Sequence, residues 1–289
     1  MRMTGESVAF CPGHISGYFK RIMGQDAATT GSCGAGIVIS EGVYARVEPS
    51  NHTSICICRR ESAGELALIS HESPPIAYAM KMLSLNATVT TECSLPIGAG
   101  FGLSAAAILA TLTALDNLFN LGMGEDRIAR AAHESEIVHR TGLGDVAACR
   151  GGGLVVRANA GIAAPVRRYL GLIEPVYAVS FGPIHTPDVL GSKEQMDKVT
   201  AAFPEKVPQT IGEFFSLSKN FAQSSGLLTP EVSEVLTLCE NAGVPASMTM
   251  LGNGVFAYGM RAKDVLSGFG TLYEMHVAQK GARIIEGSS

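Results

Sequence analysis

The segment from residue 96 to residue 107, which reads PIGAGFGLSAAA, constrains the fold more than any other part of the chain. Its three closely spaced glycines predict a tight turn, because glycine adopts backbone conformations that other residues avoid. From Ser104 to Phe119 apolar residues recur on every side of a helical period, so we expect a buried central helix with a rigidly held N-terminus. The unpaired N–H groups of such a helix, next to a glycine turn, favour a bound phosphate. A tight turn that only leads into a buried helix is the alternative, and the segment alone leaves both open.

Two better-known phosphate-binding patterns do not fit this segment. The P-loop pattern ends in Gly-Lys-Ser/Thr, whereas Leu103 and Ser104 follow Gly102 here. The dinucleotide pattern G-x-G-x-x-G needs a glycine at position 103, which is leucine. A phosphate at this turn would therefore be held by backbone N–H groups without a lysine from the loop.

The composition predicts a globular protein of two domains. A chain of 289 residues with 46% hydrophobic and 17% charged residues can bury a large core. A loosely patterned stretch at 159–165 suggests a boundary, which gives an N-terminal domain over 1–160 and a C-terminal domain over 161–289.

Charge and cysteine usage exclude several classes of function. A net charge of −4 without a long basic run argues against nucleic-acid binding. There is no run of eighteen apolar residues and no apolar signal core, so we expect a cytoplasmic protein without a membrane partner. Seven scattered cysteines do not suggest a disulfide framework and are typical of a reducing compartment.

Periodicity and turn signals predict the order of the elements. Glycine and proline predict turns at Pro12-Gly13 and over 31–36, and alternation predicts a hairpin of strands 37–47 and 53–58. Further predicted strands cover 87–93, 154–157, 176–181 and 282–285, and further predicted helices cover 75–83, 125–140, 204–226, 230–242 and 263–269.

Three polar residues in the N-terminal half of the chain could serve phosphoryl transfer, which needs a triphosphate cradle, ligands for Mg²⁺ and a group that positions the acceptor hydroxyl. The Ser104 hydroxyl can either cap the helix or bind Mg²⁺. Glu136 lies on the predicted helix 125–140, and Asp145 follows it across a Thr-Gly-Leu-Gly turn. Helical carboxylates are more often solvated surface groups. Glu134 is the weaker candidate, since it points to a different side of the helix.

The same segments resemble the GHMP kinases, whose second motif reads Pro-x-x-x-Gly-Leu-Ser-Ser-Ser-Ala-Ala. The resemblance implies the GHMP kinase fold, an α+β fold with a ribosomal-S5-like N-terminal half and a ferredoxin-like C-terminal half. It implies that the N-terminal domain binds ATP and Mg²⁺ and that the C-terminal domain contributes to the substrate pocket. It implies that Ser104 and Glu136 bind Mg²⁺ and that Asp145 is the base or orients the acceptor, so that all three are catalytic. The implied ATP-binding residues are Pro96, Gly98, Ala99, Gly100, Phe101, Gly102, Leu103, Ser104 and Ala105.

Phrases spread from end to end, including AFCPGHISGYF at 9–19 and AHESEIVHRTGLGDVAA at 131–147, are similar to the archaeal pantoate kinases. This resemblance implies transfer of phosphate from ATP to the terminal hydroxyl of pantoate, on an archaeal route to coenzyme A, by a homodimer. Another hydroxy acid, homoserine or a sugar as acceptor is the alternative, as is a ligand sensor without turnover.

Pantoate carries a carboxylate and two hydroxyls, so its pocket needs a cation and a few short donors. Arg157 could bind the carboxylate through its guanidinium group, because the predicted pocket has few other charges. The alternative, which is the commoner case, is an arginine on the surface. His133, Ser32 and Thr186 complete the predicted set, against the alternatives of a packed histidine and local turn hydrogen bonds.

Three features depart from the related kinases. His14 stands where mevalonate kinases have a lysine, only Gly252 and Gly254 remain of the third glycine motif, and Cys33 stands where the resemblance predicts an arginine.

Overall fold

Two long antiparallel strands, β1 (Ser7–Ile22) and β2 (Gly31–Pro49), run through the computed structural model, which describes residues 5–61 and 64–287. They form the centre of an eight-stranded sheet in the order β12-β1-β2-β5-β3-β4, and β6 pairs with both β2 and β7. The other strands of this sheet are β3 (Ser54–Arg60), β4 (Leu66–Ser70), β5 (Ala87–Cys93), β6 (Leu154–Arg157), β7 (Arg167–Tyr169) and β12 (Arg283–Gly287).

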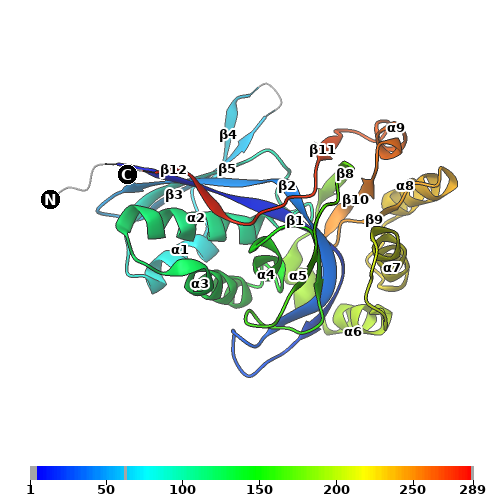
Figure 1. The fold of residues 1–289 in the computed structure, drawn as a ribbon, viewed down its shortest axis with the longest axis horizontal. Coiled ribbons are helices and arrows are strands. Elements are labelled where there is room, and N and C mark those ends of the chain that lie inside the picture. The colour runs from blue at the N-terminus through cyan, green and yellow to red at the C-terminus, as the bar shows by residue number, and fades with distance from the viewer. Residues whose placement is uncertain (1–4, 62–63, 288–289) are drawn as a thin grey trace.

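Four helices accompany this sheet. They are α1 (Pro74–Met82), α2 (Leu103–Phe119), α3 (Gly124–His139) and the short α4 (Asp145–Cys149). Helix α2 lies directly under β1 and β2 (Figure 1), and its apolar residues are buried on all sides as the sequence predicts. The N-terminus of α2 is therefore held by the core.

A second sheet of four strands has the order β11-β8-β10-β9 and packs against helices of the C-terminal part (Figure 1). Its strands are β8 (Val176–Pro183), β9 (Ala246–Met248), β10 (Gly252–Tyr258) and β11 (Tyr273–Met275). The helices of this part are α5 (Thr186–Gly191), α6 (Lys193–Ala202), α7 (Ile211–Ser224), α8 (Pro230–Asn241) and α9 (Arg261–Leu266). Helices α7, α8 and α9 contact this sheet, whereas α6 contacts α5, α7 and β1. The α+β class is confirmed. The boundary at residue 160 stays a prediction, and two strands beyond it, β7 and β12, pair within the larger sheet.

The two glycine turns predicted near the N-terminus are wrong. Pro12 and Gly13 lie inside β1, at a bulge, and residues 31–36 lie inside β2. The glycines serve close approach there instead: a Cβ on Gly13 would lie 2.7 Å from the carbonyl oxygen of Phe101. The glycine loop can therefore pack directly on the backbone of β1.

The predicted hairpin of strands 37–47 and 53–58 is also wrong. Strand β5 lies between β2 and β3, antiparallel to the first and parallel to the second. The helix predicted over 204–226 begins only at Ile211, where the Thr210 hydroxyl accepts a hydrogen bond from the backbone N–H of Glu213. Helix α6 was not predicted. Within the described residues, none of the helices is both long and apolar enough to cross a bilayer.

Candidate active site

The glycine loop ends at the N-terminus of α2 in a backbone conformation that glycine favours. Gly98, Gly100 and Gly102 have φ values of 81°, 83° and 63°. The N-cap residue is Gly102, which has no side chain to cap the helix, and the first hydrogen bond within the helix runs from the Ala106 N–H to the Gly102 carbonyl. The N–H groups of the first turn thus remain available for an anion.

A cavity of about 310 Å³ opens in front of this loop. Its walls include six of the predicted ATP-binding residues, namely Gly98, Gly100, Phe101, Gly102, Leu103 and Ser104. Three others, Pro96, Ala99 and Ala105, do not line the cavity, and Ala99 and Ala105 are buried in the core. The glycine loop therefore lines the cavity mainly with backbone atoms.

Glu136 reaches the same cavity from α3 and is buried, which excludes the solvated-carboxylate alternative. Its Oε1 accepts a hydrogen bond of 3.2 Å from the Thr141 hydroxyl, whereas its Oε2 is buried without a partner. Burial, and then the negative charge of Asp145, raises the pKa of Glu136 to about 8, and the Ser104 and Thr141 hydroxyls act in the opposite direction. A buried, unpartnered carboxylate oxygen beside a serine hydroxyl fits a hard cation such as Mg²⁺.

Replacing Glu136 by glutamine is expected to flatten the pH dependence of stability in the metal-free protein. The raised pKa means that the folded state binds the proton more tightly than the unfolded chain does. This contribution is fully present below about pH 4.5 and is lost as the pH rises through about 8. In EDTA, urea unfolding should show the wild-type free energy falling by an amount on the order of a few kcal/mol over that range.

The matched control for this experiment is Glu134→Gln. Glu134 lies on the same helix but accepts a hydrogen bond of 3.1 Å from the Tyr78 hydroxyl, away from the cavity. The Glu134 variant should keep the wild-type slope. Equal slopes for wild type and the Glu136 variant would contradict the assignment.

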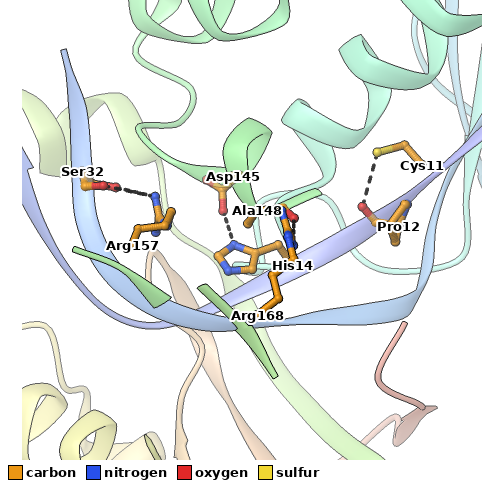
Figure 2. A network of polar contacts seen from close by, with 8 residues as sticks. All are labelled: Cys11, Pro12, His14, Ser32, Asp145, Ala148, Arg157 and Arg168. Atoms are coloured by element: carbon orange, nitrogen blue, oxygen red, sulfur yellow. Dashed lines mark hydrogen bonds and ion pairs between the residues drawn. The ribbon is translucent and has the colours of Figure 1, made fainter. Parts of the chain in front are cut away.

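Asp145, the first residue of α4, lines the cavity with a side chain that is 22% exposed. Its Oδ1 lies 2.7 Å from Nδ1 of His14 on β1 (Figure 2). Burial acts to raise the pKa of Asp145, but the hydrogen bond from His14, the electrostatic interaction with His14 and then that with Arg157 outweigh it and hold the pKa below its usual value. Asp145 is therefore a carboxylate at neutral pH.

Arg157 at the end of β6 is buried, so the surface alternative for it is wrong. Its Nη1 donates a hydrogen bond of 2.9 Å to the Ser32 hydroxyl (Figure 2), and its Nε has no partner. A Cβ on Gly144 would lie 1.2 Å from this Nη1, so the glycine before Asp145 leaves the room that the guanidinium fills. The TGLG turn thus brings Arg157 next to the catalytic candidate.

Of the other predicted substrate residues, Ser32 and His133 lie near Arg157. The Nε2 of His133 lies 2.9 Å from the Thr30 carbonyl oxygen, and burial lowers the pKa of the ring. Ser32, His133 and Arg157 gather around the β1–β2 connection and the TGLG turn, and none of them lines the 310 Å³ cavity. Thr186 begins α5, but its side chain lies outside the described residues.

Several cavity residues were not among the predicted site residues, although Ile97 lies in the glycine segment and Thr141 in the TGLG turn. They are Ser16, Ile97, Thr141, Ile184, His185, Met250 and Leu251. The Leu-Gly-Asn-Gly segment supports the glycine loop: a Cβ on Gly252 would lie 2.1 Å from the carbonyl oxygen of Ala99. Met250 and Leu251 before it form part of the wall. A position that packs two loops together cannot be read from either loop alone.

Residues 74–153, which contain the glycine loop, Glu136 and Asp145, match the family model of the GHMP kinases N terminal domain. Over 96% of its length the chain is 43% identical to a pantoate kinase of Methanospirillum hungatei, of which it covers 96%. The chain belongs to the pantoate kinase family. The family resemblance predicted from the motifs is thereby confirmed.

A second pantoate kinase and a solved structure are also similar to this chain over almost its whole length. A pantoate kinase of Thermococcus kodakarensis is 30% identical over 92% of this chain and 94% of its own. A solved structure described as a phosphotransferase related to the CoA biosynthesis pathway superposes with a TM-score of 0.78 at 27% identity, covering 96% of this chain and 98% of that one. The GHMP kinase fold expected for this pantoate kinase family member is confirmed as well.

Proposed function

We propose that this chain transfers the γ-phosphoryl group of ATP to the terminal hydroxyl of pantoate, giving 4-phosphopantoate for coenzyme A synthesis. The observation that carries the proposal is the position of one ionised carboxylate, Asp145, on the wall of the cavity at the glycine loop. The 43% identity to a pantoate kinase over 96% of the chain supports pantoate as the acceptor. The cytoplasmic location and the homodimer stay predictions.

The triphosphate is held by the glycine loop and the first turn of α2. Its oxygens meet the N–H groups and the positive end of the helix, which the core holds still. Because the donor N–H groups are already in place before the nucleotide arrives, little reorganisation accompanies transfer.

Mg²⁺ would be bound by Ser104 and Glu136 together with phosphate oxygens. Among the described residues no cluster of three or more His, Cys, Asp or Glu side chains could hold a metal by itself, which agrees with an ion shared with the nucleotide. Bound there, the ion supplies charge neutralisation of the transferring phosphoryl group. Glu136 meets it with the Oε2 that otherwise lacks a partner.

Asp145 accepts a hydrogen bond from the pantoate hydroxyl. This hydrogen bond orients a lone pair of the hydroxyl oxygen toward the γ-phosphorus. The lowered pKa of Asp145 makes it a weak base, so it orients the nucleophile and accepts the proton as the new P–O bond forms. Arg157 and Ser32 do not line the cavity itself but lie directly behind Gly144, the residue before Asp145. Under the proposal the acceptor must therefore extend past the TGLG turn, where the fork of the guanidinium would bind its carboxylate.

Replacing Arg157 by alanine is expected to raise the KM for pantoate by about 30-fold or more, equivalent to about 2 kcal/mol, while the KM for ATP changes little. The loss follows from removing the cation that pairs with the pantoate carboxylate. ADP release would be measured against each substrate separately. Arg167→Ala, an exposed arginine on β7, is the control. An unchanged pantoate KM would remove Arg157 from the pocket.

The function as a whole is tested by ADP release with ATP, Mg²⁺ and a panel of pantoate, homoserine and galactose. Pantoate should give the highest kcat/KM. Faster turnover of homoserine or galactose would overturn the choice of acceptor. Binding of ATP and pantoate without any ADP release would favour the ligand sensor.

A further inference from the structure

His14 lies behind Asp145 and does not line the cavity. Its side chain is fully buried, whereas that of Asp145 is 22% exposed. The two are 131 residues apart in sequence, and Figure 2 shows the imidazole on β1 pointing at the carboxylate from α4. A substrate in the cavity can therefore contact Asp145 but not His14, so any effect of His14 on catalysis must pass through Asp145.

The 2.7 Å contact decides which ring nitrogen carries the proton. An ionised carboxylate only accepts hydrogen bonds, so Nδ1 of His14 must be the N–H donor. The Nε2 atom is buried without a partner and lies against Gly36, where a Cβ would be 2.2 Å away. A second proton on Nε2 would bury an unpaired N–H. Burial lowers the pKa of the His14 ring and outweighs the Asp145 carboxylate, which acts to raise it, and Arg157 and Arg168 act in the same direction as burial. The ring is therefore neutral, with the proton on Nδ1.

The backbone of the same residue holds the glycine loop. The His14 N–H donates a hydrogen bond of 2.9 Å to the carbonyl oxygen of Phe101. Gly102 also packs directly on the His14 backbone, since a Cβ there would lie 2.9 Å from the His14 carbonyl oxygen and 3.1 Å from its backbone nitrogen. His14 thus contacts both the phosphate-binding side of the cavity, through its main chain, and the acceptor side, through its ring.

We propose that His14 is a positioning residue that holds one oxygen of the Asp145 carboxylate and leaves the other facing the acceptor hydroxyl, at a distance set by the glycine loop. This rests on the proposed role of Asp145. The imidazole orients the carboxylate by a hydrogen bond, and both His14 and Arg157 favour the ionised form of Asp145. Because in-line transfer depends on alignment, a loose Asp145 should lower kcat more than either KM.

The first test is the protonation state of His14 in the wild-type protein. Two-bond nitrogen–hydrogen NMR spectra of histidine-labelled protein at pH 7.5 should show His14 as a neutral ring with its proton on Nδ1. The signal is assigned by its loss in His14→Asn. A proton on Nε2, or an imidazolium at this pH, would overturn the proposal.

The second test compares three substitutions. Asparagine places its amide near the position of Nδ1, whereas glutamine places its amide near Nε2, against Gly36, and cannot reach Asp145 in the same way. We expect His14→Asn to keep kcat within about 10-fold of wild type, and His14→Gln and His14→Ala to lose about 100-fold or more, with both KM values little changed. A loss confined to KM, or an equal kcat loss in folded asparagine and alanine variants, would overturn the proposal. The NMR test does not depend on how these variants fold.

The third test separates this inference from the proposed function. If His14 acts only through Asp145, a His14→Ala, Asp145→Asn double variant should have the same kcat as Asp145→Asn alone. Additive losses would overturn the positioning role. Absence of pantoate-dependent ADP release from the wild-type protein would instead defeat the proposed function, and the NMR result on His14 would stand.

Discussion

The Asp145→Asn variant is expected to lose about 10²- to 10⁴-fold in kcat, the range typical of removing a general base. The change replaces the carboxylate that accepts the proton of the acceptor hydroxyl with a neutral amide of the same shape. The amide oxygen can still accept the hydrogen bond from Nδ1 of His14, so the site should keep its geometry. Turnover is measured by ADP release at saturating ATP and pantoate.

Nucleotide binding and Tm separate lost chemistry from lost structure in this variant. ATP affinity should stay close to wild type, since Asp145 lies on the acceptor side of the cavity, and Tm should change little. Asp197→Asn, on the exposed face of α6, is the matched control and should retain full activity. A fully active Asp145→Asn enzyme would refute the role assigned to this carboxylate.

The Gly144→Ala variant is expected to lower kcat/KM for pantoate by about 100-fold or more. The added Cβ would lie 1.2 Å from Nη1 of Arg157 and 2.6 Å from the Ser32 hydroxyl, so the guanidinium must move. Because Asp145 is the next residue, its carboxylate should shift too, and a displacement of about 1 Å can cost about 100-fold. Steady-state kinetics with pantoate as the varied substrate would measure the loss.

The control for Gly144→Ala is Gly268→Ala, whose Cβ would meet nothing within 4 Å. That variant should be indistinguishable from wild type. In an Arg157→Ala background, Gly144→Ala should cost much less than in the wild type, because the atom it collides with is gone. Full additivity of the two losses would show that the glycine matters for some reason other than the space it leaves for Arg157.

The elements with strong local signals were predicted closely. The predicted helix from Ser104 to Phe119 differs from α2 by one residue at its start, and the strands at 87–93 and 154–157 have the observed bounds. Helical periodicity and β-branched runs are properties of consecutive residues, so they can be read without knowing what packs on them. The family was predicted for the same reason, since its motifs are contiguous.

The errors arose where glycine serves packing between distant segments. Residues 31–36 resemble a turn, yet they lie in β2, where a Cβ on Gly34 would be 2.2 Å from the Tyr18 carbonyl oxygen. The same composition is typical of a turn and of a strand that another backbone approaches closely.

The predicted hairpin is wrong for a different reason. Strand β5, which begins at Ala87 and so follows both β2 and β3 in the sequence, lies between them in the sheet.

The sequence by itself determined the glycine loop and the buried helix behind it, and its family motifs pointed to Glu136 and Asp145, which the structure places at the cavity in front of that loop. The tertiary structure alone decided which residues surround those carboxylates. His14 reaches Asp145 across 131 residues, and Arg157 reaches Ser32 across 125, through the pairing of β1, β2 and β6. Such contacts depend on the register of strands that meet only in the folded sheet, and no local pattern of residues records that register.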